Sequence, residues 1–160
     1  MRYYLAYGSN LNKDQMSRRC PDAKPVCRWI MANYHLVFRR GYLTIEPMKG
    51  GCVPCGVWAI SEQDEKNLDR YEGYPRFYRK ECFPAMVPDP EELTGKLVTA
   101  LVYVMNDGYE VQPPTNEYMT TCRIGYKNFD LDLDPLMEAY ERAKWPENYT
   151  TVSTTKVDQK

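Results

Sequence analysis

The chain has 160 residues, the usual size of one domain with its own hydrophobic core. Its 21 Lys and Arg residues nearly balance 22 Asp and Glu residues, so we expect no basic surface for nucleic acid or an anionic membrane. The apolar runs are too short to span a bilayer, and the N-terminus leads into a strand pattern rather than a signal peptide, so a soluble, cytoplasmic protein is expected.

The first sixty residues are dominated by strand patterns. The residues 34–45 are rich in aromatic and β-branched types but are interrupted by Arg39-Arg40-Gly41, which predicts two strands joined by a turn. The expected elements are a strand at 2–7, a short helix at 12–19, strands at 34–38 and 42–45, a Gly- and Pro-rich loop at 48–54, and a strand at 56–60.

The rest of the chain alternates helices with further strands. Ser61 followed by Asp64 resembles a capping box, which predicts a helix that ends at Gly73. The other expected elements are strands at 77–87 and 97–105 joined by an acidic loop at 88–95, and helices at 115–128 and 134–144. This order predicts an α+β fold: one domain over 1–145 with a small mixed β-sheet or barrel and peripheral helices, followed by a polar tail at 146–160.

The six cysteines carry little functional signal. Cys52 and Cys55 have C-x-x-C spacing, which occurs in redox pairs and in halves of zinc sites. However, the chain holds no second C-x-x-C and only one histidine, and a strand pattern rather than a helix start follows the pair. We therefore expect reduced thiols with structural or incidental roles, and no metal site.

The turn that ends the first strand is the first candidate site. Tyr7-Gly8-Ser9-Asn10-Leu11 runs from a strand into a short helix, which gathers unpaired backbone N–H groups that bind anions or a developing oxyanion. Gly8 permits close approach of a ligand, while Ser9 and Asn10 add side-chain donors. The alternative interpretation is a plain turn in which Asn10 or Asn12 caps the helix.

Glu72 is the second candidate. It lies in the last turn of the predicted helix, just before its glycine stop, where the helix dipole disfavours a carboxylate. Both this position and apolar neighbours are expected to raise its pKa, which suits a general acid/base near neutral pH. The alternative is an exposed glutamate at a fraying helix end, paired with Arg70 or Arg76.

Three segments occur in the order found in one protein family. The loop Tyr7–Leu11 is similar to that family's Y-G-S-N-L signature, and Leu68-Asp69 with Glu72-Gly73 and Tyr78 is similar to its L-D-x-x-E-G…Y segment. Residues 113–125 are similar to its P-P-x-x-x-Y…G helix, in which Tyr118 is the tyrosine. Jointly these motifs resemble the γ-glutamylcyclotransferase family over most of residues 3–145.

The resemblance implies a fold, a reaction and a set of site residues. Members have a small mixed-sheet barrel and, as transferase- or lyase-type enzymes, release an amine or amino acid from a γ-glutamyl compound by closing the glutamyl residue into 5-oxoproline. No cofactor is implied, and the implied partner is the small-molecule substrate. By resemblance Glu72 is the catalytic acid/base, and the substrate-binding residues are Tyr7, Gly8, Ser9, Asn10, Leu11, Tyr78 and Tyr118.

Two other functions stay open at this point. A protein with the same fold would bind or tailor a different γ-glutamylated metabolite, and the rim residues that meet the leaving group would then decide its identity. That rim is expected around Arg39-Arg40, residues 74–76 and the loop 106–112. The third function is a metal or thiol-redox module that uses Cys52 and Cys55.

Overall fold

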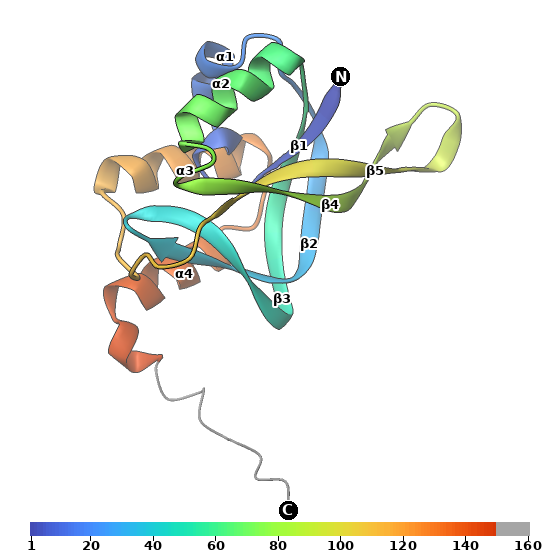
Figure 1. Ribbon diagram of the computed structural model, residues 1–160. Coiled ribbons are helices and arrows are strands. Elements are labelled where there is room, and N and C mark those ends of the chain that lie inside the picture. Colours follow the sequence, from blue (N-terminus) through green and yellow to red (C-terminus); the bar gives the residue numbers. More distant parts are fainter. Residues whose placement is uncertain (150–160) are drawn as a thin grey trace, which may run out of the picture.

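One mixed sheet organises the computed structural model, which describes residues 1–149 (Figure 1). Its strand order is β2-β3-β1-β5-β4. The short central strand β1 (Arg2–Ala6) pairs antiparallel with β3 (Tyr42–Ile60) and parallel with β5 (Glu92–Met105), while β2 (Lys24–Arg39) and β4 (Tyr78–Asp89) pair antiparallel with β3 and β5. The single parallel pairing makes the sheet mixed, and the predicted α+β class is confirmed.

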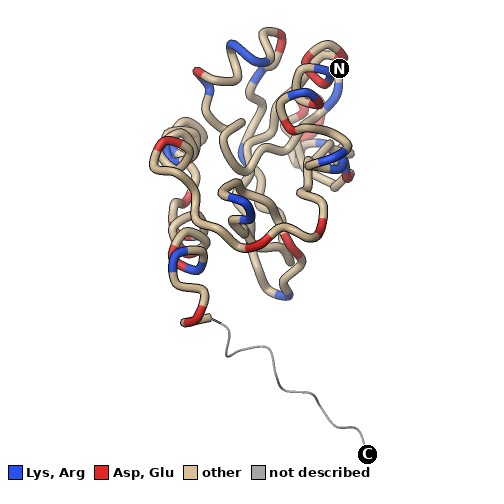
Figure 2. Tube along the Cα trace, turned by 60° about the vertical axis from the view of Figure 1, so that its left-hand side comes forward, with Lys and Arg blue, Asp and Glu red and all other residues tan. Residues whose placement is uncertain are grey.

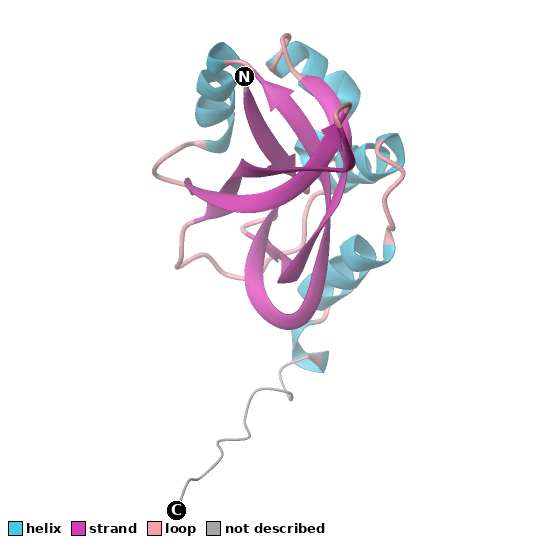
Figure 3. Ribbon diagram, turned by 90° about the vertical axis from the view of Figure 1, so that its right-hand side faces the viewer, coloured by secondary structure: helices cyan, strands magenta, loops and turns pink. Residues whose placement is uncertain are grey.

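The two edge strands of the sheet curl toward each other. The rings of Tyr34 on β2 and Phe83 on β4 meet edge to face, with centroids 5.1 Å apart. Elsewhere on the same two strands the Cys27 thiol lies 3.7 Å from the Met86 carbonyl oxygen. The sheet is therefore curved into an open barrel, with the helices on its periphery (Figure 3).

Within residues 1–149, four α-helices surround the sheet, and their boundaries follow the capping residues seen in the sequence. They are α1 (Lys13–Arg19), α2 (Glu62–Glu72), α3 (Asn116–Asn128) and α4 (Asp134–Lys144), with 3₁₀ turns η1 (Ser9–Leu11) and η2 (Pro146–Asn148). Asn12 caps α1 by accepting a hydrogen bond from the Gln15 backbone N–H. Both halves of the capping box predicted for α2 are present, and Gly73 ends that helix in a left-handed conformation at φ 66°.

The α2 capping box gives a first testable expectation. The Ser61 hydroxyl accepts from the Asp64 backbone N–H at 3.1 Å and donates to the Asp22 carboxylate at 2.9 Å. Replacing Ser61 with Ala should lower the free energy of unfolding by about 1 kcal/mol in a urea titration. The exposed Gln63→Ala substitution in the same helical turn is the control, and an equal loss there would contradict the capping argument.

Two predicted loops are wrong, because both belong to long hairpins. The stretch 48–54 lies inside β3. The register of its pairing with β2 shifts between Ala32, which is opposite Cys52, and Tyr34, which is opposite Pro47, so β3 takes up the extra residues as a bulge. The stretch 88–95 is mostly strand, since β4 extends to Asp89 and β5 begins at Glu92. The predicted turn at Arg39-Arg40-Gly41 is correct, and positive φ angles of 53° and 83° at Arg40 and Gly41 match the turn type that suits twisted hairpins.

The remaining sequence predictions concern the surface and the C-terminal end. Of the predicted tail 146–160, Pro146–Asn148 forms the turn η2, and residues 150–160 lie outside the described residues. Within residues 1–149 no helix is both long and apolar enough to cross a membrane. Basic and acidic residues alternate along the trace instead of separating into opposite faces (Figure 2).

A close contact between η1 and α3 holds the loop after β1 against a helix that is far from it in the sequence. Leu11 is fully buried, and a Cβ added at Gly125 of α3 would lie 2.7 Å from the Leu11 Cβ and 2.6 Å from the Asn12 backbone nitrogen. Gly56 of β3 permits a similar approach of the Leu11 side chain from the other side. Glycine at these two positions therefore lets the loop after β1 sit directly on α3 and the sheet.

Candidate active site

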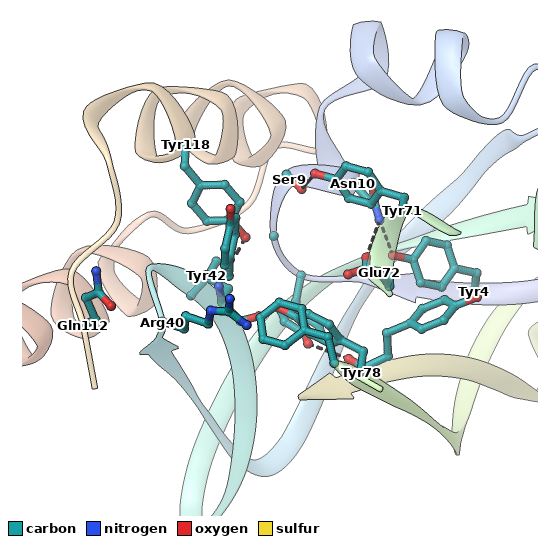
Figure 4. Close-up of a pocket in the computed structure, with 15 residues that line it drawn as sticks. Tyr4, Ser9, Asn10, Arg40, Tyr42, Tyr71, Glu72, Tyr78, Gln112 and Tyr118 are labelled. Carbon is teal, nitrogen blue, oxygen red and sulfur yellow. Dashed lines mark hydrogen bonds between the residues drawn. The ribbon is translucent and has the colours of Figure 1, made fainter. Parts of the chain in front are cut away.

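A cavity of about 660 Å³ opens where five segments meet at one end of the barrel (Figure 4). The loop after β1, the end of α2, the start of β4, the β2–β3 turn and the start of α3 all contribute to it. Aromatic rings form most of its wall, and a few polar groups point inward. Its lining consists of Tyr4, Tyr7, Gly8, Ser9, Asn10, Arg40, Tyr42, Leu43, Tyr71, Glu72, Phe77, Tyr78, Tyr103, Gln112 and Tyr118.

Glu72 enters this cavity as the last residue of α2. Because Gly73 turns the chain sharply away, the carboxylate faces the loop after β1, and the Asn10 amide donates a 2.9 Å hydrogen bond to its Oε1. Burial raises the pKa of Glu72 to about 7, against the opposing effects of the Arg19 charge and the Asn10 hydrogen bond. The expected rise is confirmed, with burial as its main cause, and the hydrogen-bond partner is Asn10 rather than Arg70 or Arg76.

The loop opposite Glu72 presents unpaired main-chain donors. Tyr7 fixes its start, because its hydroxyl donates to the Tyr103 carbonyl at 2.5 Å and its own carbonyl accepts from Tyr126 at 2.8 Å. The first backbone N–H groups of η1, those of Ser9 and Asn10, have no hydrogen-bond acceptor among the described residues. The turn thus places two main-chain donors without an acceptor among residues 1–149 at the cavity wall.

The predicted tyrosines Tyr78 and Tyr118 both line the cavity and hold the β2–β3 hairpin. The Tyr78 hydroxyl donates to the Leu43 carbonyl at 2.7 Å, and the Tyr118 hydroxyl accepts from the Leu43 backbone N–H at 3.2 Å. Gly8 packs against Tyr118 and Leu43, since a Cβ there would lie 3.3 Å from the Tyr118 hydroxyl and 3.4 Å from the Leu43 Cδ1. Three segments that are far apart in sequence are therefore joined around the backbone of Leu43.

One predicted residue lies elsewhere, and several lining residues escaped prediction. Leu11 points into the core and does not line the cavity. Tyr4 lines it from the middle of β1, a position that looked purely structural in the sequence. Arg40 and Gln112 do belong to the expected rim, whereas Arg39 faces away and pairs with Glu46 at 2.6 Å. The lining residues outside both the site prediction and the expected rim are Tyr4, Tyr42, Leu43, Tyr71, Phe77 and Tyr103.

The cysteine pair does not form a functional unit in this structure. Cys52 is exposed and Cys55 is fully buried, as expected for residues three apart in a strand, and both are free thiols. Burial raises the pKa of Cys55 to about 12, opposite to what a reactive thiolate needs. Among the described residues no group of three His, Cys, Asp or Glu side chains is placed to hold a metal ion.

Chemically, the cavity combines a titratable acid with fixed donors in an aromatic enclosure. A carboxylate whose pKa lies near 7 both accepts and donates protons readily at neutral pH. The N–H groups of Ser9 and Asn10 have no acceptor among the described residues, so they are open to an acceptor atom of a bound molecule. The arrangement suits proton transfer on a small substrate that carries an amine and develops an oxyanion.

Comparisons with known proteins relate the chain to one family. The family model described as "Gamma-glutamyl cyclotransferase, AIG2-like" matches residues 4–122. A Homo sapiens protein named Gamma-glutamylcyclotransferase is 27% identical, and the match covers 92% of this chain and 80% of that protein.

Solved structures share the fold of this chain. One named Gamma-glutamyl cyclotransferase has a TM-score of 0.69 and 24% identity, with 99% of this chain and 92% of that one covered. A Homo sapiens protein described as uncharacterized has a TM-score of 0.68 and 25% identity with the same coverage.

Proposed function

The chain belongs to the gamma-glutamyl cyclotransferase, AIG2-like family, and from this premise we propose that it cyclises a γ-glutamyl group to 5-oxoproline and releases an amine or amino acid. The observation that supports the proposal best is the pairing of Glu72 with the Ser9–Asn10 donors across one cavity. A γ-glutamyl unit carries an ammonium for the carboxylate and a carbonyl and carboxylate for the donors. The protein's own residues thus offer a partner for the ammonium and for one of these two acceptor groups.

In the proposed mechanism both reacting groups belong to the substrate. Glu72 takes a proton from the α-ammonium, and the freed amine nitrogen attacks the γ-carbonyl carbon to form a five-membered ring. The bond from that carbon to the leaving nitrogen then breaks as Glu72 returns the proton to this nitrogen. The ring nitrogen gives up the second proton that it carries after the attack, and the released amine takes this proton up to become an ammonium. Folding the glutamyl chain into the closure geometry supplies the proximity gain, and the backbone donors of Ser9 and Asn10 hold either the oxyanion or the α-carboxylate.

The experiment that tests the proposal is a substrate panel. The purified protein is incubated with γ-glutamyl amino acids, a γ-glutamyl dipeptide and γ-glutamyl alkylamides, and 5-oxoproline is measured by mass spectrometry. Formation of 5-oxoproline together with equimolar free amine supports the proposal. Binding without turnover across the panel would instead favour a protein of the same fold that recognises another γ-glutamylated metabolite.

The pKa of Glu72 predicts the shape of the pH profile. A group that accepts a proton from the substrate must be ionised in the free enzyme, and burial raises the pKa of Glu72 to about 7. The value of kcat/KM should therefore fall about tenfold per pH unit below pH 7 and level off above it. Profiles measured between pH 5 and 9 check this, and a profile that stays flat down to pH 5 would contradict it.

A further inference from the structure

The Asn10 side chain uses both ends of its amide in the site. Its Nδ2 donates to the Tyr4 hydroxyl and to the Glu72 Oε1, each at 2.9 Å. Its Oδ1 accepts a hydrogen bond from the Arg19 Nη1. Both donor hydrogens and the carbonyl oxygen are thereby engaged, and the residue is almost completely buried.

Arg19, the last residue of α1, is itself held on several sides. Its guanidinium stacks on the Tyr71 ring with Cζ 3.3 Å from the ring centroid, and its Nη2 donates to Gln15 at 3.3 Å. The Tyr71 hydroxyl in turn hydrogen-bonds to the Ser9 hydroxyl at 2.9 Å. Among the described residues Arg19 forms no salt bridge. Its guanidinium instead donates to Asn10, and its charge acts on the carboxylate of Glu72.

The orientation of the Asn10 amide decides whether its nitrogen or its oxygen faces the Glu72 carboxylate. With the carbonyl toward Arg19, the amide nitrogen points at the carboxylate. A flipped amide would place its oxygen against the Glu72 oxygens and its nitrogen against the guanidinium, so both contacts would be repulsive. Arg19 can only donate, and it therefore selects one of the two amide orientations.

We propose that Arg19 is a positioning residue for the reaction, which acts through Asn10 by fixing the amide so that it donates to Tyr4 and Glu72 together. One consequence concerns Tyr4. Because its hydroxyl oxygen accepts from Asn10 and has no acceptor for its own hydrogen among the described residues, that hydrogen is available to a substrate in the cavity. The inference rests on the proposed function for its catalytic meaning, but the geometry it concerns can be tested without turnover.

The other groups that face Glu72 are neutral near physiological pH. They are phenols from four segments, and burial raises the pKa of each well above its ordinary value: Tyr4 in β1, Tyr7 after it, Tyr78 in β4 and Tyr118 in α3. Arg40 lies across the cavity at the β2–β3 turn (Figure 4). Arg19 is therefore the charged group whose removal should move the Glu72 titration.

The test compares Arg19→Gln with Arg18→Gln. Arg18 lies one residue earlier in α1 and pairs with Asp14 on the surface, so its substitution removes the same charge without touching the site. The pKa of Glu72 is read from the ¹³Cδ resonance of glutamate-labelled protein, assigned with Glu72→Gln. We expect Arg19→Gln to raise the Glu72 pKa by about one pH unit and Arg18→Gln to leave it within about 0.2. A Glu72 titration that does not move in Arg19→Gln would overturn the proposal.

A double-mutant cycle tests the route through Asn10. The value of kcat is measured at pH 9, where Glu72 is ionised in the wild type and in Arg19→Gln, Asn10→Ala and the double variant. If Arg19 acts through Asn10, we expect the Arg19 substitution to lower kcat about tenfold alone and less than twofold in the Asn10→Ala background. Additive losses would overturn the proposed route.

A second Arg19 variant and the wild-type activity distinguish failure of the Arg19 proposal from failure of the proposed function. Should Arg19→Gln fail to fold, Arg19→Lys takes its place. It keeps the cation but loses the planar fork, so it should lower kcat while moving the Glu72 pKa by less than about 0.3. Absence of turnover by the wild type on every γ-glutamyl compound would count against the proposed function, while the NMR titrations would still decide whether Arg19 sets the protonation of Glu72.

Discussion

Replacing Glu72 with Gln should lower kcat by about 10²- to 10⁴-fold, the range of a well-positioned general acid/base. The substitution keeps the size of the side chain and an oxygen that can accept from Asn10, but removes the group that moves the proton. Because ground-state contacts are largely retained, KM should change far less than kcat. Steady-state release of 5-oxoproline, with circular dichroism to check the fold, measures both.

Glu65→Gln is the matched control for this prediction. Glu65 lies two turns earlier on α2 and pairs with Arg2 and Lys80, away from the cavity. Its substitution should leave kcat within about twofold of the wild type. Wild-type turnover by Glu72→Gln would remove Glu72 from the mechanism, whatever the rest of the cavity does.

Gly125→Ala should destabilise the protein by about 2–3 kcal/mol, although glycine to alanine in a helix normally stabilises by up to about 1 kcal/mol. The added Cβ would fall 2.6–2.8 Å from backbone atoms of Leu11 and Asn12, which cannot move aside as a flexible side chain does. Either α3 or the loop after β1 must shift, so kcat should fall as well. Urea unfolding gives the free energy, and the same preparation gives kcat.

The Gly125 prediction is specific because helix propensity alone would give the opposite sign of the change in the free energy of unfolding. Thr120→Ala, at an exposed position of the same helix, should be neutral or slightly stabilising because it only improves helix propensity. If Gly125→Ala proved as stable as the wild type, the close packing of η1 on α3 would be refuted. If it lost stability but kept full kcat, the loop would be shown to tolerate displacement.

The parts of the fold that depend on local signals could be predicted from the sequence. Asn12, Ser61 and Gly73 set helix ends through hydrogen bonds to residues three or four positions away, so these residue types alone indicated the boundaries. The long hairpins could not be predicted in this way. Residues 48–54 contain Gly and Pro that normally break strands, but pairing with β2, a non-local interaction, keeps them in β3.

In the candidate site too, the residues marked by local sequence signals could be predicted, and those that depend on non-local packing could not. Glu72 and the loop Tyr7–Asn10 were predictable because a glycine stop and a strand-to-helix turn are visible in the sequence, and the family resemblance joined them. Tyr4 and Arg19 were not, because their part in the site depends on sheet pairing and on how α1 packs beside α2. Leu11 was misplaced for a similar reason, since its motif position says nothing about which way its side chain points.

The loop after β1 is held by partners about a hundred residues further along the chain: Tyr7 meets Tyr103 and Tyr126, and Leu11 sits against Gly125. This loop, which we propose binds the substrate, therefore lacks part of its support until residues 103–126 have been synthesised. Protein fragments truncated before α3 should consequently show no ligand affinity, and hydrogen exchange at Leu11 should report global unfolding rather than a local opening.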